Sequence, residues 1–162
     1  MKKLLTSTMI ALLLVIVLTS SSFAAPEAAE RQLPFKGSIE ALETYEVDFP
    51  LMSVAASGAG TATYLGRFAV SYTVEEVNLL TNAGTGEAIQ FVAANGDSLF
   101  AEGLGQATET GIPGVFNVVE HYTITGGTGR FAGASGNITT DRIVDITTGI
   151  TSGTISGNIV LP

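Results

Sequence analysis

The sequence predicts an all-β protein that folds as an eight-stranded antiparallel up-and-down β-barrel. From residue 35 onward, apolar and polar residues alternate with a period of two, which is typical of strands with one buried face. Turns rich in glycine, proline and asparagine separate these segments at regular intervals. Eight strands at this spacing favour a barrel or a sandwich, and no stretch has the period of an amphipathic helix.

Residues 1–24 have the features of a signal peptide. Lys2 and Lys3 precede an apolar stretch, and the small residues around Ala24 predict cleavage after it. We therefore expect a secreted or periplasmic protein. We also expect that it does not span a membrane after cleavage, because the apolar stretch is shorter than the roughly 20 residues of a spanning helix. Residues 25–33 are predicted to form a flexible leader, and residues 34–162 the barrel domain.

Charge and composition exclude several kinds of partner. The formal net charge of −8 becomes −10 when Lys2 and Lys3 are removed with the signal peptide. Such an acidic chain is a poor ligand for nucleic acid or anionic membranes. The sequence has no cysteine and a single histidine, His121, which excludes disulfides and histidine- or thiolate-based metal sites. We expect no metal and no other cofactor.

The alternation also predicts where each strand lies and which way its side chains point. The expected strands are 35–48, 52–64, 67–78, 87–94, 97–108, 115–125, 134–146 and 152–161. Asn95-Gly96 is the strongest hairpin signal, because a two-residue turn of this kind needs positive φ at both positions. The residues predicted to face the interior include Phe68, Val70, Tyr72, Val74, Ile89, Phe91, Ala93, Phe116, Val118, Ile124, Ile155 and Ile159. An interior of this size holds side chains or one small ligand.

Three polar residues are predicted to meet inside the barrel. Glu120 and Tyr122 share the inward parity of their strand, and Arg142 has the inward parity of the next. A buried carboxylate needs a cation or must stay protonated. The cluster is therefore either a ligand-orienting or acid–base site, or a structural ion pair. Tyr72 is a further candidate for ligand binding, and Glu102, which lies between Phe100 and Leu104 in parity, is a weaker one.

A glycine-dense turn follows the strand that carries Tyr122. Gly126, Gly127 and Gly129 can adopt positive φ at little cost, and Gly133 and Gly136 continue the run. Phe131 is the only large apolar residue of the turn. We predict that Phe131 plugs one end of the core and that the glycines are structural.

The segment from Thr125 to Gly136 resembles the signature of plant dirigent proteins and allene oxide cyclases, T-G-G-[TS]-G-x-F-x-G-x-x-G. The resemblance implies a closed antiparallel barrel that commonly assembles as trimers. A homotrimer is also consistent with the weakly charged outward residues of the last two strands, among them Ile143 and Val160. Dirigent proteins use acidic, arginine and tyrosine side chains in the cavity, and allene oxide cyclases use polar and acidic groups around a bound water. The same residue types recur here as Glu120, Tyr122 and Arg142. No individual position of either family's site can be aligned with a position of this sequence.

Three functions follow from these observations. The first is binding of a small apolar ligand in the barrel without catalysis, which we favour. The second is an isomerase- or cyclase-like enzyme acting on a small hydrophobic substrate in the same cavity. The third is a structural or assembly protein whose barrel is filled by residues such as Phe68, Phe91 and Phe116. An outer-membrane barrel is disfavoured, because the few aromatic residues lie on the inward parity rather than in outer girdles.

Overall fold

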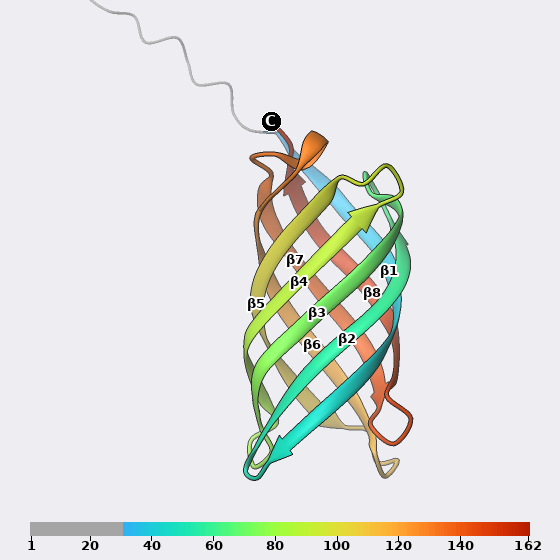
Figure 1. Ribbon diagram of the computed structural model, residues 1–162, viewed down its shortest axis with the longest axis vertical. Helices are drawn as coiled ribbons and strands as arrows, with labels where there is room; N and C mark the ends of the chain where they lie inside the picture. The colour runs from blue at the N-terminus through green and yellow to red at the C-terminus, as the bar shows by residue number, and fades with distance from the viewer. Residues whose placement is uncertain (1–30) are drawn as a thin grey trace, which may run out of the picture.

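The structure, a computed structural model, describes residues 31–162. Eight antiparallel strands close into one barrel in which each strand pairs with its neighbours in the sequence and β1 pairs with β8 (Figure 1). The strands are β1 (Gln32–Asp48), β2 (Leu51–Ala62), β3 (Gly66–Asn78), β4 (Ala83–Ala93), β5 (Ser98–Glu109), β6 (Val115–Gly127), β7 (Ser135–Asp145) and β8 (Ile150–Val160). The predicted fold class is confirmed. No helix among residues 31–162 is long and apolar enough to cross a membrane.

The two ends of the barrel differ. The β2–β3, β4–β5 and β6–β7 connections lie at what we call the closed end, at the top of Figure 1. The other four connections, β1–β2, β3–β4, β5–β6 and β7–β8, lie at what we call the open end. A one-turn 3-10 helix, η1 (Gly129–Phe131), follows β6 and carries Phe131 into the closed end, where its side chain is fully buried. The prediction that Phe131 is a core residue is confirmed.

The core occupies mainly the half of the barrel next to the closed end, and Val54 and Val74 extend it toward the other end. Inward-facing side chains from all eight strands pack there, and the ring of Phe68 meets that of Phe91 edge to face at 5.2 Å between centroids. Bulky side chains fit into the barrel because glycines lie at the neighbouring inward positions. A Cβ at Gly60, for example, would lie 2.5 Å from the Phe68 ring. Removal of this apolar surface from water is the main stabilising contribution in a chain without disulfides.

Some predicted boundaries were wrong. Gln32 and Leu33 are not part of a leader, because they pair with Val160 and Ile159 and begin β1. The rest of the predicted leader, except Arg31, and the whole predicted signal peptide lie outside the described residues. Strand β4 begins at Ala83 rather than Glu87, because a β-bulge between Gly84 and Glu87 lets pairing continue through a segment that resembles a turn.

The turn at Asn95-Gly96 connects β4 and β5 as predicted, but with a different geometry. Only Gly96 has a positive φ, of 89°. The backbone N–H of Gly96 donates to the carbonyl of Ala93, and the N–H of Ala93 donates to Asp97. The loop is thus longer than a two-residue turn, and Asn95 keeps an ordinary backbone conformation. Of the three glycines expected to adopt positive φ in the β6–β7 turn, Gly126 and Gly129 do and Gly127 does not. Gly133 and Gly136 have positive φ as well.

Candidate functional site

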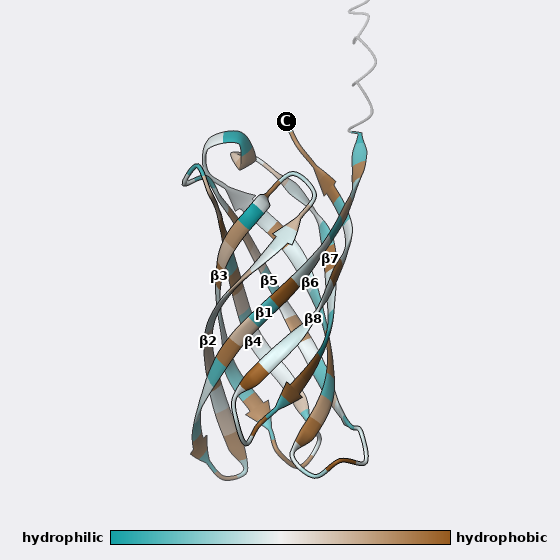
Figure 2. Ribbon diagram, turned by 90° about the vertical axis from the view of Figure 1, so that its right-hand side faces the viewer, coloured by the Kyte–Doolittle hydropathy of each residue, from teal (hydrophilic) through white to brown (hydrophobic). Residues whose placement is uncertain are grey.

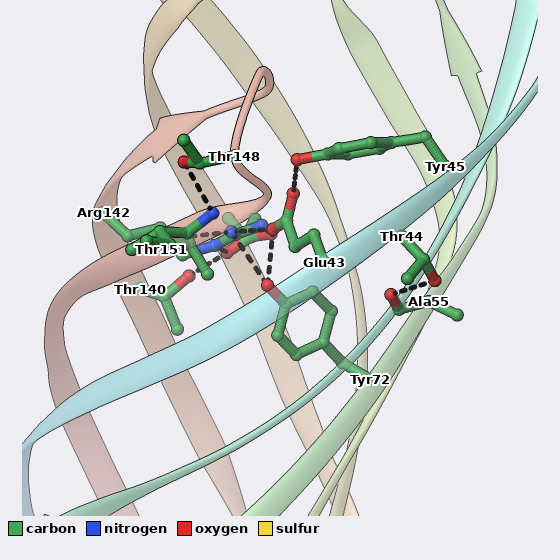
Figure 3. A network of polar contacts seen from close by, with 11 residues as sticks. Glu43, Thr44, Tyr45, Ala55, Tyr72, Thr140, Arg142, Thr148 and Thr151 are labelled. Atoms are coloured by element: carbon green, nitrogen blue, oxygen red, sulfur yellow. Dashed lines mark hydrogen bonds and ion pairs between the residues drawn. The ribbon is translucent and has the colours of Figure 1, made fainter.

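A buried ionic network crosses the barrel just below its apolar core. The guanidinium of Arg142 on β7 forms an ion pair with Glu43 on β1 (Figure 3). It forms a second ion pair with Glu120 on β6. All three side chains are at least 94% buried. Arg142 donates from Nε to Glu120 Oε2 at 2.8 Å and from Nη2 to Glu120 Oε1, which is the two-pronged geometry that arginine favours with carboxylates.

The remaining hydrogen-bonding groups of the network are also satisfied. Arg142 Nη1 donates to Glu43, to the Thr151 hydroxyl at 2.9 Å and to the Tyr72 oxygen at 3.0 Å. Tyr72 in turn donates its hydroxyl to Glu43 Oε1, and Tyr45 donates to Glu43 Oε2 at 2.7 Å. Thr140 donates to Glu120, so both carboxylates accept at each of their oxygens. A network so completely paired rigidifies its surroundings and offers few free groups to a ligand.

The pKa values of these groups agree with a network held in one protonation state. Burial raises the pKa of Tyr72 and Tyr45 far above the ordinary value, and the neighbouring Glu43 raises both further. Burial alone lowers the pKa of Arg142, but its hydrogen bond to Glu120 and the charge of that carboxylate raise it to a net value above the ordinary one. Arg142 is therefore charged and both tyrosines are neutral at any physiological pH.

A third buried carboxyl, Glu87 on β4, lies outside this network. The bulge at Thr85 and Gly86, where Gly86 has a φ of 66°, turns both Gly84 and Glu87 toward the interior. Gly84 and Gly105 leave room for the carboxyl. A Cβ atom added at Gly84 would lie 2.8 Å from Glu87 Oε1, and one added at Gly105 would lie 2.6 Å from the same oxygen. Two glycines and a bulge thus accommodate one acidic side chain.

Glu87 is 4% exposed, and its Oε2 is the only buried side-chain nitrogen or oxygen of residues 31–162 without a hydrogen-bond partner. Burial raises its pKa from 4.5 to about 8, and the nearby carboxylate of Glu120 acts in the same direction. A hydrogen bond with the Tyr122 side chain and the positive charge of Arg142 lower this pKa, but more weakly. Glu87 is therefore largely protonated at neutral pH. A buried polar atom without a partner typically costs about 1–3 kcal/mol, so this one requires an explanation.

Glu87 and the network form the floor of a cavity that opens at the open end. The cavity measures about 120 Å³. Its polar lining comprises Glu43, Tyr45, Asn82, Glu87, Gln106, Glu120 and Arg142. The apolar lining comprises Met52, Val54, Val74, Val77, Leu79, Ala107, Phe116, Val118, Val144 and Ile146. The polar groups at the floor thus face a wall that is predominantly apolar.

The structure brings most of the predicted site residues together. Glu120, Arg142 and Tyr72 belong to the ionic network, and Tyr122 is buried with its pKa raised by burial and by Glu120 and Glu87. The prediction for Glu102 was wrong, because Glu102 is exposed on the outer wall. The inward positions of β5 are instead Ala101, Gly103 and Gly105.

The residues of β5 that face inward and outward are the reverse of those predicted, because large side chains of the neighbouring strands fill the interior beside Gly103 and Gly105. A Cβ at Gly103 would lie 2.8 Å from the Tyr122 ring, and one at Gly105 would lie 2.7 Å from Glu120 Cγ. The interior beside Gly103 and Gly105 is already occupied, so only small residues face inward in this part of β5, whereas Leu99 nearer the closed end faces the core. The larger Phe100 and Leu104 lie outward, 36% and 58% exposed.

Sequence reasoning missed Glu43, Tyr45, Glu87 and Thr151. The signal was present, because Glu43 has the parity of Ile39, Glu87 that of Ile89, and Thr151 that of Ile155, all of which are buried. Extending the alternation to the polar residues of every strand finds all of them.

No group of three or more His, Asp or Glu side chains within residues 31–162 is arranged to hold a metal ion. His121 is exposed on β6 and its Nδ1 lies 3.1 Å from the Thr139 hydroxyl. Comparison of the chain with protein-family models, with curated proteins and with solved structures found no match.

Proposed function

We propose that the protein binds a small, mainly apolar ligand in the cavity at the open end. The observation that carries this proposal is the cavity itself, an apolar wall over a polar floor in a barrel whose other half is packed. Its volume of about 120 Å³ is comparable with the roughly 150 Å³ of an engineered protein cavity that binds benzene. A ligand with one six-membered ring fits, and further atoms extend toward solvent.

Apolar residues at the turns of the open end support the proposal. Each of its four connections carries one exposed large apolar side chain. These are Phe49, Leu80, Ile112 and Ile146. Phe49 and Leu80 are each 71% exposed, although solvent-facing turns usually carry polar residues. Brown, apolar segments reach the lower end of the barrel in Figure 2. Ile146 also lines the cavity, and the other three place apolar surface on the neighbouring turns, where a ligand enters or leaves.

The ionic network supplies the rigid base of this site. The groups of Arg142, Glu43 and Glu120 are paired with one another or with hydroxyls, so a ligand gains little by replacing those partners. Their role is to hold strands β1, β6, β7 and β8 in register beneath the cavity. The proposed role of the Glu120–Arg142 pair is therefore structural, which is one of the two roles that the sequence left open.

An isomerase- or cyclase-like activity is the second candidate, and Glu87 favours it. A carboxyl with a pKa of about 8 that faces an apolar cavity can donate a proton at neutral pH, as a general acid must. The resemblance of Thr125–Gly136 to dirigent proteins and allene oxide cyclases also supports this candidate. We place it second, because the described residues offer Glu87 no partner that would act as a base on the same ligand.

The binding proposal is tested by titrating single-ring compounds into the isotope-labelled protein and following methyl NMR signals of Val74 and Val118. We expect saturable shifts at these two residues with toluene. Val118→Phe narrows the cavity and should abolish the shift of Val74. Thr123→Phe, on the outer face of the same strand, should not. Unchanged toluene binding by Val118→Phe would place the ligand elsewhere.

A further inference from the structure

We propose that Glu87 selects the ligand, and that the ligand is an uncharged molecule with an acceptor oxygen, such as a ketone, aldehyde or ether, that accepts a hydrogen bond from the Glu87 carboxyl. This inference rests on the proposed function, since it requires that the cavity bind a ligand. It assigns the chemical class of that ligand and the residue that recognises it.

The first step of the argument is the free hydrogen-bonding position. Glu87 Oε2 is buried and has no partner within the described protein, although Glu87 lines the cavity. Buried polar groups of folded proteins nearly always have partners. A ligand oxygen at the floor of the cavity that reaches the Glu87 carboxyl would supply such a partner. The neighbouring positions are built around this carboxyl, because side chains at Gly84 or Gly105 would collide with it.

The second step is the charge around the floor. Glu43 and Glu120 as carboxylates already outnumber the single guanidinium of Arg142. The groups that face Glu87 from β6 and β7 are Glu120, Tyr122 and Arg142. The flanking strands β3 and β5 present Val74, Gly103 and Gly105, which carry no charge. An ionised Glu87 would add a second uncompensated negative charge, so the protonated form fits this floor and acts as a donor.

The third step excludes an anionic ligand. Among the described cations, Arg31, Lys36, Arg67 and Arg130 all lie near the closed end, and Arg142 is committed to two carboxylates. Acidic residues surround the open end instead. These are Glu46, Asp48, Glu76, Glu109 and Asp145. A carboxylate or phosphate ligand would therefore meet negative charge at the mouth and at the floor, and no free cation. An uncharged acceptor meets neither obstacle.

The test compares four single-ring probes of similar size by methyl NMR at Val74 and Val118. Toluene has no acceptor, acetophenone has an uncharged one, benzoate is an anion and benzylamine is a cation. At pH 6 we expect wild type to bind acetophenone about three- to tenfold more tightly than toluene, as one net hydrogen bond predicts. Benzoate should bind most weakly. The preference for acetophenone should decline as the pH rises through about 8, where Glu87 ionises.

Three variants complete the experiment. Glu87→Met removes the donor at similar volume and should bind acetophenone no better than toluene. Glu87→Gln keeps a donor that does not titrate, so it should retain the preference and lose its pH dependence. Glu102→Met removes an exposed carboxylate and should behave as wild type.

The outcomes separate the two proposals. Acetophenone preferred equally by wild type and Glu87→Met would overturn the role of Glu87. Tighter binding of benzylamine than of acetophenone at pH 6 would overturn the ligand class, because it would show an ionised carboxylate. Equal binding of toluene and acetophenone by wild type would overturn this inference but leave the binding function intact. Absence of saturable shifts with all four probes would overturn the binding function, and the inference with it.

Discussion

Arg142 and Glu43 are joined by an ion pair although they lie 99 residues apart in the sequence. They come from β7 and β1, which flank β8, the strand that closes the barrel. Thr151 of β8 accepts a hydrogen bond from the same Nη1 atom at 2.9 Å. The pair therefore spans the closure of the sheet. The second carboxylate, Glu120, holds the same guanidinium from β6.

Removal of either the cation or one carboxylate of this network should strongly destabilise the folded protein. Arg142→Met strands two buried carboxylates, and Glu120→Gln leaves the guanidinium with one. Breaking a buried pair from one side typically costs about 3–5 kcal/mol. Denaturant unfolding of the single and double variants should show that the double change costs less than the sum of the single changes. Effects that add within about 0.5 kcal/mol would show that the two side chains act independently.

Phe131→Ala should lower the free energy of unfolding by about 3–5 kcal/mol, because the ring is fully buried at the closed end. Phe100→Ala is the matched control, since Phe100 is 36% exposed on the outer wall and its loss should cost clearly less. The measurement is the midpoint of urea unfolding. Equal midpoints for the two variants would contradict the plugging role of Phe131.

The protonation of Glu87 should appear in the pH dependence of stability. Its pKa is raised from 4.5 to about 8 on folding, so the folded protein keeps a proton that the unfolded chain releases between these values. The stabilisation is complete below pH 4.5 and is lost as the pH rises through about 8. The stability of wild type relative to Glu87→Gln should fall with a slope approaching about 1.4 kcal/mol per pH unit within this window. A constant difference from pH 5 to 8 would show that Glu87 is ionised throughout.

Two N-terminal truncations should separate the beginning of β1 from what precedes it. A chain that begins at residue 35 loses the pairing of Gln32 and Leu33 with β8, and it loses the packing of Leu33 against the core. It should melt at a clearly lower temperature than a chain that begins at residue 31. Identical melting temperatures in scanning calorimetry would mean that the first residues of β1 contribute nothing to the barrel.

We also predict that the protein forms a homotrimer through its outer wall. Leu42 and Ile150 are paired neighbours on β1 and β8, 54% and 60% exposed, and Ile143 on β7 is 46% exposed. Exposed apolar side chains gathered on one face are typical of protein interfaces. Light scattering at high micromolar concentration should give a trimer mass for wild type and a smaller one for Ile150→Lys. A monomer mass for wild type would refute the trimer.

The local alternation of the sequence was sufficient to predict the fold class and the inward faces of β3, β4 and β6. It was also sufficient to place Glu120 and Arg142 inside, since parity depends only on the backbone geometry of a strand. It failed on β5, where hydropathy predicts a shared inward face for Phe100, Glu102 and Leu104. Which residues of β5 face inward depends instead on the space that remains beside Tyr122, Glu87 and Glu120, which lie on other strands.

The sequence by itself therefore determined the strands, their order and the plug at Phe131, because these depend on periodicity, turn residues and one large apolar side chain in a glycine-rich loop. Only the tertiary structure decided which polar groups pair. Closure of β1 onto β8 brings Glu43 to Arg142, and the bulge at Gly86 lets Gly84 face inward as well, where it leaves room for the Glu87 carboxyl. Pairing depends on distances in three dimensions. Only the closed barrel therefore shows that Glu87 Oε2 is the one buried side-chain oxygen of residues 31–162 without a hydrogen-bond partner.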